Sequence, residues 1–349
     1  MCIRDSSSII EIDHVYKEYR TIKRKPGLMG SIGTFFSREY VINKAVKDIS
    51  FTIDTGNIVA LLGPNGAGKS TLIKIMIGVL QPSSGTVRIN GVDPSLHRND
   101  FLKSIGVVFG QRTQLWWALP VIESFRQLKE IYEVPDKTYN HNIQLFTDVL
   151  DIGNLLSKPV RELSLGQRTL CDILAAFLHD PILVFLDEPT IGLDVSMKNK
   201  IRKLIKELNK EKTTCTILTS HDMGDVDALC ERLLLIDKGS LIYNDSLKKF
   251  QTYFGRYKTL RIQIAPMEEQ NYPTKKDILR ELATHQISTD HVEKVSVLEP
   301  SMYELLVNEE KADTLYLIQL IKDHYMVNDI QITNLSTADV LNRIYEGNL

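Results

Sequence analysis

Nine consecutive residues, Gly63 to Thr71 (GPNGAGKST), limit what this chain folds into more than any other stretch. They follow Ile58 to Leu62, a short apolar run of the kind found in buried parallel strands. They precede Leu72 to Leu80, which is apolar almost all round and predicts a buried helix. An ordinary glycine turn is the alternative, but a strand before and a helix after are the context of a phosphate-binding P-loop. The stretch therefore predicts a site for a nucleoside triphosphate.

Each part of this loop has a chemical role in holding phosphates. Gly63, Gly66 and Gly68 let backbone N–H groups turn inward around phosphate oxygens, and the following helix adds the positive end of its dipole. Lys69 is expected to reach the β- and γ-phosphates, and the Ser70 hydroxyl is expected to bind Mg²⁺. The predicted nucleotide-binding residues of the loop are Gly63, Pro64, Asn65, Gly66, Ala67, Gly68, Lys69, Ser70 and Thr71.

Composition limits the class of protein. The chain has 349 residues, 43% of them hydrophobic, which is enough for about two domains. The formal net charge is −2, so no overall positive field favours nucleic acid, and no nucleic-acid partner is expected. The four cysteines are scattered without metal-ligand spacing, which indicates free thiols in a reducing compartment. Without a signal peptide or an apolar run near ~18 residues, the chain is expected in the cytoplasm unless a partner holds it at a membrane.

Ahead of the loop, the sequence predicts two strands separated by an insertion. Residues 9–19 and the alternating residues 49–53 are typical of strands, while residues 1–8 carry no core pattern and are treated as a leader. The insertion at 21–39 begins with basic residues and continues with apolar ones, so it is either a surface loop, which we favour, or a membrane contact. An aromatic residue before the P-loop strand is suited to stack on a nucleobase, with Tyr40 as the candidate and Tyr19 as the second choice.

After the loop, strands and helices alternate. Residues 105–109 predict a strand that delivers Gln111, and the pattern from Pro120 onward is helical, which indicates an inserted helical subdomain at about 112–165. Residues 182–186 predict a buried strand that ends in Asp187 and Glu188. The fold class predicted from this alternation is α/β, a P-loop NTPase-like, mostly parallel sheet.

The two carboxylates at the end of that strand point to chemistry. Buried charges are costly unless they meet cations, and nucleotide hydrolysis needs one carboxylate on a metal and another on water. The next predicted strand, 216–220, presents His221 at its end. A helix-cap carboxylate and a solvated histidine are the alternative interpretations of Glu188 and His221, and the nearby P-loop makes them the weaker ones.

Taken together, these residues resemble the ATP-binding subunit of a bacterial ABC transporter of the exporter-type branch, over about residues 9–254. One short motif is weak support, but six in register are specific. In the family's order they are Walker A (Gly63 to Thr71), the Q-loop glutamine (Gln111), the signature as LSLGQ (with Ser164, Leu165, Gly166 and Gln167), Walker B as ILVFLDE (ending in Asp187 and Glu188), the D-loop (Asp194) and the switch histidine (His221).

The resemblance implies roles for these landmarks. Gln111 and Asp187 would complete the Mg²⁺ site with the P-loop serine, Glu188 would activate the attacking water, and His221 would contact the γ-phosphate; the implied catalytic residues are Glu188, His221 and Gln111. The signature would contact ATP bound by another subunit, so a homodimer or heterodimer around two ATP molecules is implied. Leu165 replaces the usual glycine, which puts the backbone at this position in question because leucine tolerates positive φ poorly.

Two regions outside these motifs add expectations. Trp116 and Trp117, the only tryptophans, either anchor the permease or fill the joint between the helical subdomain and the sheet. Residues 255–349 show the order β-α-β-β-α-β of a small ferredoxin-like domain, which joins dimers, senses a regulator or, by default, stabilises the chain.

The function implied by the resemblance is an ATPase subunit that powers a separate membrane permease, with export as the expected direction. Such a subunit would attach peripherally to the cytoplasmic face of the membrane through the permease. The alternative is a soluble ABC ATPase acting on ribosomes or DNA. Those proteins usually carry two nucleotide domains or a long coiled-coil insertion, and a basic face, and this sequence displays none of them. A nucleotide-dependent switch with negligible turnover is a third possibility, which Glu188 and His221 argue against.

Overall fold

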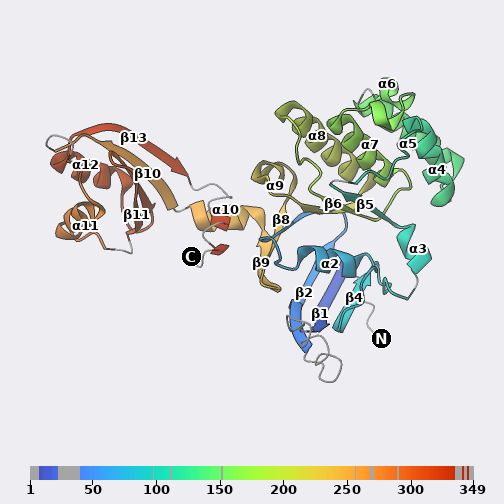
Figure 1. Ribbon diagram of the computed structural model, residues 1–349, viewed down its shortest axis with the longest axis horizontal. Coiled ribbons are helices and arrows are strands. Elements are labelled where there is room, and N and C mark those ends of the chain that lie inside the picture. Colours follow the sequence, from blue (N-terminus) through green and yellow to red (C-terminus); the bar gives the residue numbers. More distant parts are fainter. Residues whose placement is uncertain are drawn as a thin grey trace, which may run out of the picture. The chain divides into compact units, whose positions relative to one another are not determined.

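The computed structural model describes residues 8–22, 40–96, 98–110, 112–150, 152–255, 257–267, 271–288, 291–334, 340–341 and 344–345. Gln111, the first seven residues and residues 23–39 of the expected insertion lie outside them. The chain divides into two compact units, residues 1–247 and 248–349, each with its own hydrophobic core (Figure 1).

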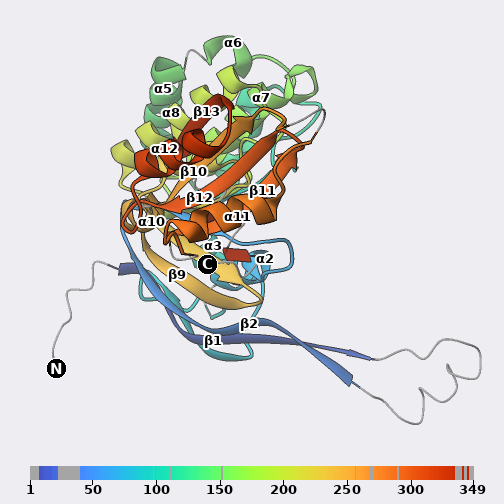
Figure 2. The ribbon, with the colours of Figure 1, turned by 90° about the vertical axis from the view of Figure 1, so that its left-hand side faces the viewer.

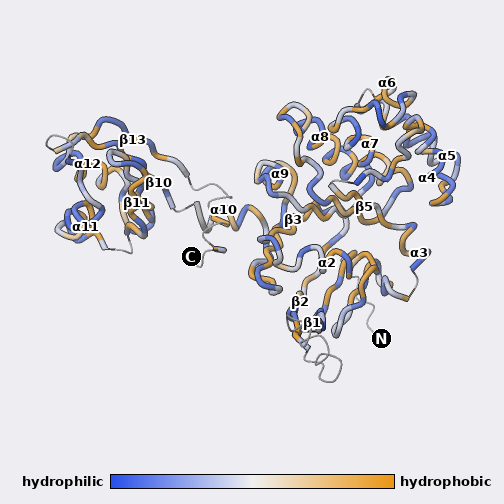
Figure 3. Tube along the Cα trace, viewed as in Figure 1, coloured by the Kyte–Doolittle hydropathy of each residue, from blue (hydrophilic) through white to orange (hydrophobic). Residues whose placement is uncertain are grey.

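The first unit is built on a six-stranded sheet in the order β5-β6-β7-β3-β8-β9. Its strands are β3 (Ile58–Leu62), β5 (Ile105–Phe109), β6 (Leu183–Asp187), β7 (Cys215–Thr219), β8 (Arg232–Asp237) and β9 (Ser240–Ser246). All neighbouring pairs are parallel except β8 and β9. Apolar runs with helices on both faces favour parallel pairing, and Figure 3 shows hydrophobic residues along β3 and β5. This confirms the predicted mostly parallel α/β fold.

A second, antiparallel sheet in the order β2-β1-β4 packs beside it. It consists of β1 (Ser8–Ile22), β2 (Tyr40–Asp54) and β4 (Ser84–Ile89). Helix α2 (Lys69–Met76) lies between the two sheets (Figure 1), and one core joins Ile10 and Ile53 of this sheet to Leu61 of β3 and Leu72 of α2. The separate sheet was not expected from sequence, because the strand patterns alone do not say which strands pair.

Apart from the short α3 (Arg98–Leu102), the remaining helices of this unit lie above the six-stranded sheet in Figure 1. They are α4 (Val121–Ile131), α5 (Asp136–Leu150), α6 (Gly153–Leu156), the 3₁₀ turn η1 (Val160–Glu162), α7 (Leu165–Phe177), α8 (Val195–Lys212) and α9 (Met223–Leu229). Helix α7 buries Ile173, Leu174 and Phe177 and runs back to β6. It therefore links the helical segment to the strand that carries Asp187.

The second unit has a four-stranded antiparallel sheet in the order β11-β12-β10-β13. Its elements are α10 (Leu247–Gly255), β10 (Tyr257–Ile264), α11 (Lys275–Thr284), β11 (Val292–Glu299), β12 (Met302–Asn308), α12 (Thr314–His324) and β13 (Val327–Asn334). Tyr303 fills the core, and its hydroxyl donates to the Pro273 carbonyl at 2.6 Å. This sheet order agrees with the predicted ferredoxin-like unit. Among the described helices of the chain, none is both long and apolar enough to cross a membrane.

Candidate functional site

The P-loop joins β3 to α2 in a conformation that requires glycine. Gly68, which precedes α2, has φ 110°, and a Cβ atom added to it would lie 2.4 Å from the Ala45 carbonyl oxygen of β2. The Lys69 ammonium curls back and donates to the carbonyls of Gly63 at 2.6 Å and Pro64 at 3.1 Å. Burial lowers the pKa of Lys69, and the carboxylates of Glu188 and Asp187 oppose that shift. The site therefore holds a partly desolvated cation whose charge is favoured by two acids nearby.

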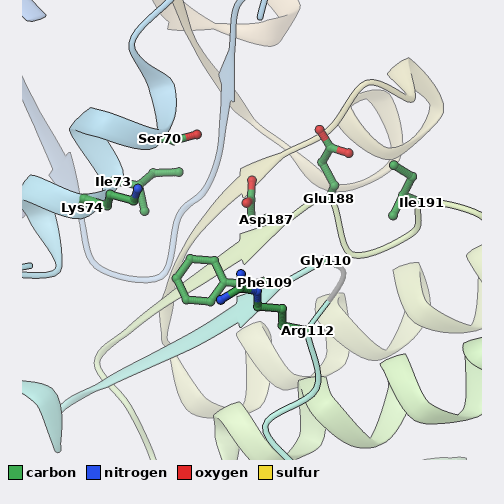
Figure 4. A pocket seen from close by; sticks show the side chains of 9 residues that line it. All are labelled: Ser70, Ile73, Lys74, Phe109, Gly110, Arg112, Asp187, Glu188 and Ile191. Atoms are coloured by element: carbon green, nitrogen blue, oxygen red, sulfur yellow. The ribbon is translucent and has the colours of Figure 1, made fainter. Parts of the chain in front are cut away.

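A cavity of about 520 Å³ brings the two predicted motifs together. Ser70 lines it from α2, and Asp187 and Glu188 line it from the end of β6. Figure 4 shows the Ser70 hydroxyl and both carboxylates around one space, with Phe109 and Arg112 on its other side. The sheet order explains this arrangement, because β3 and β6 are separated by β7 alone and their carboxyl ends share one edge.

The Asp187 carboxylate is oriented by its neighbour on β7. Asp187 and Thr219 are paired in register, and the Thr219 hydroxyl donates to Asp187 Oδ1 at 2.5 Å. Gly110 lies so close that a Cβ atom there would be 2.6 Å from the Asp187 carbonyl oxygen. Within the described ranges, no three His, Cys, Asp or Glu side chains form a metal site by themselves. The donors present, one carboxylate and one hydroxyl, fit Mg²⁺, which usually takes its other ligands from phosphates and water.

Glu188, which lines this cavity, is paired with His221. His221 Nε2 lies 2.8 Å from Glu188 Oε1. The Glu188 backbone has φ 51°, and its N–H donates to the Thr219 carbonyl at 3.0 Å. The glutamate side chain is 27% exposed, so it remains accessible to water. An oriented, accessible carboxylate beside a phosphate site is suited to accept a proton from an attacking water.

A buried network behind this pair escaped the sequence reasoning. Asp225 of α9 is fully buried and accepts from the Ser220 hydroxyl at 2.8 Å, from the Thr190 hydroxyl and from the Arg202 guanidinium at 2.7 Å. It thereby ties the residue before His221 to the segment after Glu188 and to α8. The sequence feature that could have indicated this network is Asp225 itself, an acidic residue four positions before Leu229 on the apolar face of a short helix.

The signature segment starts α7 with a capping box. The Ser164 hydroxyl accepts from the Gln167 N–H at 3.3 Å, and the Gln167 side chain accepts from the Ser164 N–H at 3.1 Å. Leu165 is helical, exposed and not at positive φ, so the leucine introduces no strain. Gly166 is buried, and a Cβ atom there would lie 2.4 Å from Met197 Cγ. Asp194 caps α8 by accepting from the Met197 N–H at 3.0 Å.

The signature is not part of the cavity around its own P-loop. Figure 1 places α7 and α2 on opposite sides of the six-stranded sheet. No signature residue lines the cavity that Ser70 and Asp187 share. The helix N-terminus at Ser164 is therefore presented away from the site that the same chain builds.

The structure does not bring Tyr40 to the P-loop. Tyr40 starts β2, pairs with Ile22 and is 51% exposed. Ala45, the β2 residue beside Gly68, is five positions further on, which corresponds to about 17 Å of strand. The distal part of this strand pair extends away from the central sheet (Figure 2). Tyr19 pairs with Asn43, two positions from Ala45.

Trp116 and Trp117 lie between β5 and α4 and remain accessible. Their exposed fractions are 39% and 54%. The Trp116 N–H donates to the buried Ser124 hydroxyl at 3.1 Å, so the backbone is attached to α4 while the rings stay on the surface.

Comparisons with known proteins agree with this geometry. The family model described as "ABC transporter" matches residues 46–191. The ABC transporter ATP-binding protein NatA of Bacillus subtilis is 32% identical over 213 residues, which cover 61% of this chain and 86% of NatA. The structure of cbiO1 from Clostridium perfringens, described as part of an ABC transporter complex, has 24% identity and a TM-score of 0.57 over 79% of this chain and 95% of cbiO1. The ATP-binding cassette MJ0796, a dimer bound to ADP and Pi, has 23% identity and a TM-score of 0.54 over 68% of this chain and 98% of its own.

Proposed function

Because this chain belongs to the ABC transporter family, we propose that it closes with a second ATP-binding subunit around two ATP molecules and drives a separate membrane permease. Membership of this family identifies the chain as an ATP-binding subunit and an ATPase. The observation that carries the proposal is the cavity that joins Ser70, Asp187 and Glu188, with His221 2.8 Å from Glu188.

We assign the phosphates to the P-loop. Lys69 bonds two loop carbonyls, and a triphosphate offers it stronger, charged acceptors at the same place. A bound Mg²⁺ would supply Lewis-acid stabilisation of the phosphate charge, and Ser70, Asp187 and Gln111 are the residues assigned to hold it. For the nucleobase, the position of Tyr19 in β1 favours it over Tyr40.

We assign the hydrolytic step to Glu188 and His221. The Glu188 carboxylate accepts the proton of a water that lies between it and the γ-phosphate, because it faces the cavity from the end of β6. The His221 ring holds the carboxylate in place through Nε2 and lies at the same edge of the sheet, which suits it to contact the γ-phosphate. Asp187 suits the role of base less well, because its Oδ1 already accepts from the Thr219 hydroxyl.

We assign the second half of each ATP site to the partner subunit. The N-terminus of α7 offers the positive end of its dipole and the N–H groups of its first turn that the capping box does not use, and it faces away from the chain's own P-loop. A dimer in which each signature faces the other subunit's ATP uses this surface. The dimer of the similar cassette MJ0796 supports this arrangement.

We assign the permease contact to the exposed tryptophan pair and the direction to export. Trp116 and Trp117 present large apolar surface beside the helical segment, which suits a protein interface. The exporter direction rests on the resemblance of a single nucleotide unit with a small C-terminal unit to exporter-type subunits. The localisation that follows is peripheral attachment to the membrane through that permease.

Glu188→Gln tests the proposal. Losing the general base should lower steady-state ATPase activity by about 10²- to 10⁴-fold while calorimetric ATP affinity is retained. With ATP and Mg²⁺ the variant should also convert to a dimer in light-scattering chromatography. Glu211→Gln, an exposed residue of α8, is the matched control and should change neither property. Full ATPase activity of Glu188→Gln, or an ATP-saturated monomer, would contradict the proposal.

A further inference from the structure

One buried carboxylate binds the segment after Gln111 to the signature helix. Asp172 lies in the second turn of α7 and is 6% exposed. Its Oδ1 accepts from the Thr113 hydroxyl at 2.8 Å and from the Gln114 backbone N–H at 3.0 Å. The Gln114 side chain donates back to the Asp172 backbone carbonyl at 2.9 Å. Three hydrogen bonds thus join Thr113 and Gln114 to one helical residue that is 59 and 58 positions away from them in sequence.

The same segment is attached again at the tryptophans. The Arg168 guanidinium of α7 lies 5.4 Å from the centre of the Trp117 ring, a cation–π distance. The Arg161 N–H donates to the Trp117 carbonyl at 3.0 Å. Thr113 Oγ1 also accepts from the Leu115 N–H at 3.1 Å, which holds the turn that leads to the rings. The tryptophan pair is therefore bonded to α7 and to the turn that precedes it.

Burying the Asp172 carboxylate has a desolvation cost that packing contacts alone would not justify. Burial raises the pKa of Asp172 to about 6, against the hydrogen bonds from Thr113 and Gln114 and the charge of Arg168, all of which lower it. An apolar residue of similar volume would fill the same space without that desolvation cost. What the carboxylate adds is two directed hydrogen bonds to the loop.

We propose that Asp172 is a positioning residue that makes the surface of Trp116 and Trp117 move with α7 when ATP closes the dimer. This rests on the proposed function, in which the Ser164 end of α7 meets the partner's ATP. Helix α7 is a continuous 13-residue helix, so a displacement of its capped end carries Asp172 with it. The hydrogen bonds to Thr113 and Gln114 then pass that displacement to the tryptophans. The position of the tryptophan surface, which the proposed permease contacts, thereby depends on whether ATP is bound.

The chain reports on this segment by its own fluorescence, because Trp116 and Trp117 are its only tryptophans. The experiment measures acrylamide quenching of the full-length Glu188→Gln protein with and without ATP and Mg²⁺. The parent should show an ATP-dependent change in quenching. Adding Asp172→Ala or Thr113→Val should reduce that change while calorimetric ATP binding persists, because the contacts of Trp117 with Arg161 and Arg168 remain. Asp172→Asn should restore it, since the amide oxygen accepts the same two bonds.

The matched control is Thr147→Val in α5, whose hydroxyl bonds to the Ile143 carbonyl of its own helix. It should keep the full ATP-dependent change. An unchanged response in both Asp172→Ala and Thr113→Val overturns the proposal, and so does an ATP-bound parent with no change in quenching. Thr113→Val decides alone if Asp172→Ala does not fold. A parent that binds no ATP in the calorimeter would instead refute the proposed function.

Discussion

At the scale of single residues, the candidate site holds Glu188 in a backbone conformation that few non-glycine residues adopt. Its φ of 51° costs on the order of 1–3 kcal/mol and persists only where the surroundings determine it. Those surroundings are the Thr219 carbonyl, which accepts from the Glu188 N–H, and the His221 ring. A turn at this point aims the glutamate at the cavity while the preceding Asp187 stays in register with β7. Two adjacent carboxylates thus obtain different directions.

Asp225 supports this geometry from behind, and Asp225→Ala should show it. The change leaves the Arg202 guanidinium and the Ser220 and Thr190 hydroxyls without their common acceptor. Breaking such a buried pair by removing one partner should lower the free energy of unfolding by about 3–5 kcal/mol. Urea denaturation measures this. Asp148→Ala, at an exposed position of α5, should stay within about 0.5 kcal/mol of wild type, and a similarly small loss for Asp225→Ala would contradict the assignment.

At the scale of elements, α4, α7 and β5 meet at a neutral histidine. The His179 ring, just after α7, stacks on Tyr132 at 4.0 Å between ring centres, and its Nε2 donates to the Ile105 carbonyl of β5 at 3.0 Å. Its Nδ1 is buried without a hydrogen-bond partner among the described residues. Desolvation lowers the pKa of His179 to about 4. This joint between the helical segment and the sheet is therefore built around an uncharged ring.

The joint predicts acid sensitivity. The folded-state pKa of about 4 lies below the ordinary 6.5, so the unfolded chain binds the extra proton first as pH falls. The contribution of His179 to the free energy of unfolding is intact above pH 6.5 and is lost progressively below it. By pH 5 the loss is about 2 kcal/mol. Urea denaturation of wild type and His179→Phe at pH 7.5 and 5.0 measures it. The variant keeps an aromatic ring against Tyr132. Between the two pH values, its free energy of unfolding should fall by about 2 kcal/mol less than that of wild type. Equal losses in both proteins would contradict the role of the histidine.

At the scale of the whole molecule, the chain has two units with separate cores. The core of the first unit gathers residues from both of its sheets and from α2, and the core of the second lies between its antiparallel sheet, α11 and α12. The residues of the candidate site all belong to the first unit. ATP binding therefore stabilises one unit directly.

Calorimetry of the full-length Glu188→Gln chain should resolve this division. Two unfolding transitions are expected, and saturating ATP with Mg²⁺ should raise the midpoint of one of them. At a ligand concentration 100-fold above Kd, the stabilisation of that unit is about 2.7 kcal/mol. The control is the Lys69→Ala variant, prepared free of ADP, which lacks the phosphate-binding ammonium. A single transition that ATP shifts as a whole would contradict independent units.

Much of this protein is determined locally and was predictable for that reason. The P-loop, the capping box at Ser164 and the strands that end at Phe109 and Asp187 depend on residues within a few positions of each other, through turn chemistry, side-chain capping and apolar runs. The ferredoxin-like order of the second unit was predictable in the same way, from alternating strand and helix periods.

Only the tertiary structure decided which of these pieces meet. Strand order placed Thr219 beside Asp187, and the packing of the helices placed Asp172 against Thr113 and Asp225 against Arg202. The register of β1 and β2 set Tyr40 far along the strand from the P-loop. No local pattern encodes these pairings, because each depends on how distant segments bury their apolar faces together. The physical reason is that propensity and capping act along the chain, whereas burial and buried hydrogen bonds act between its parts.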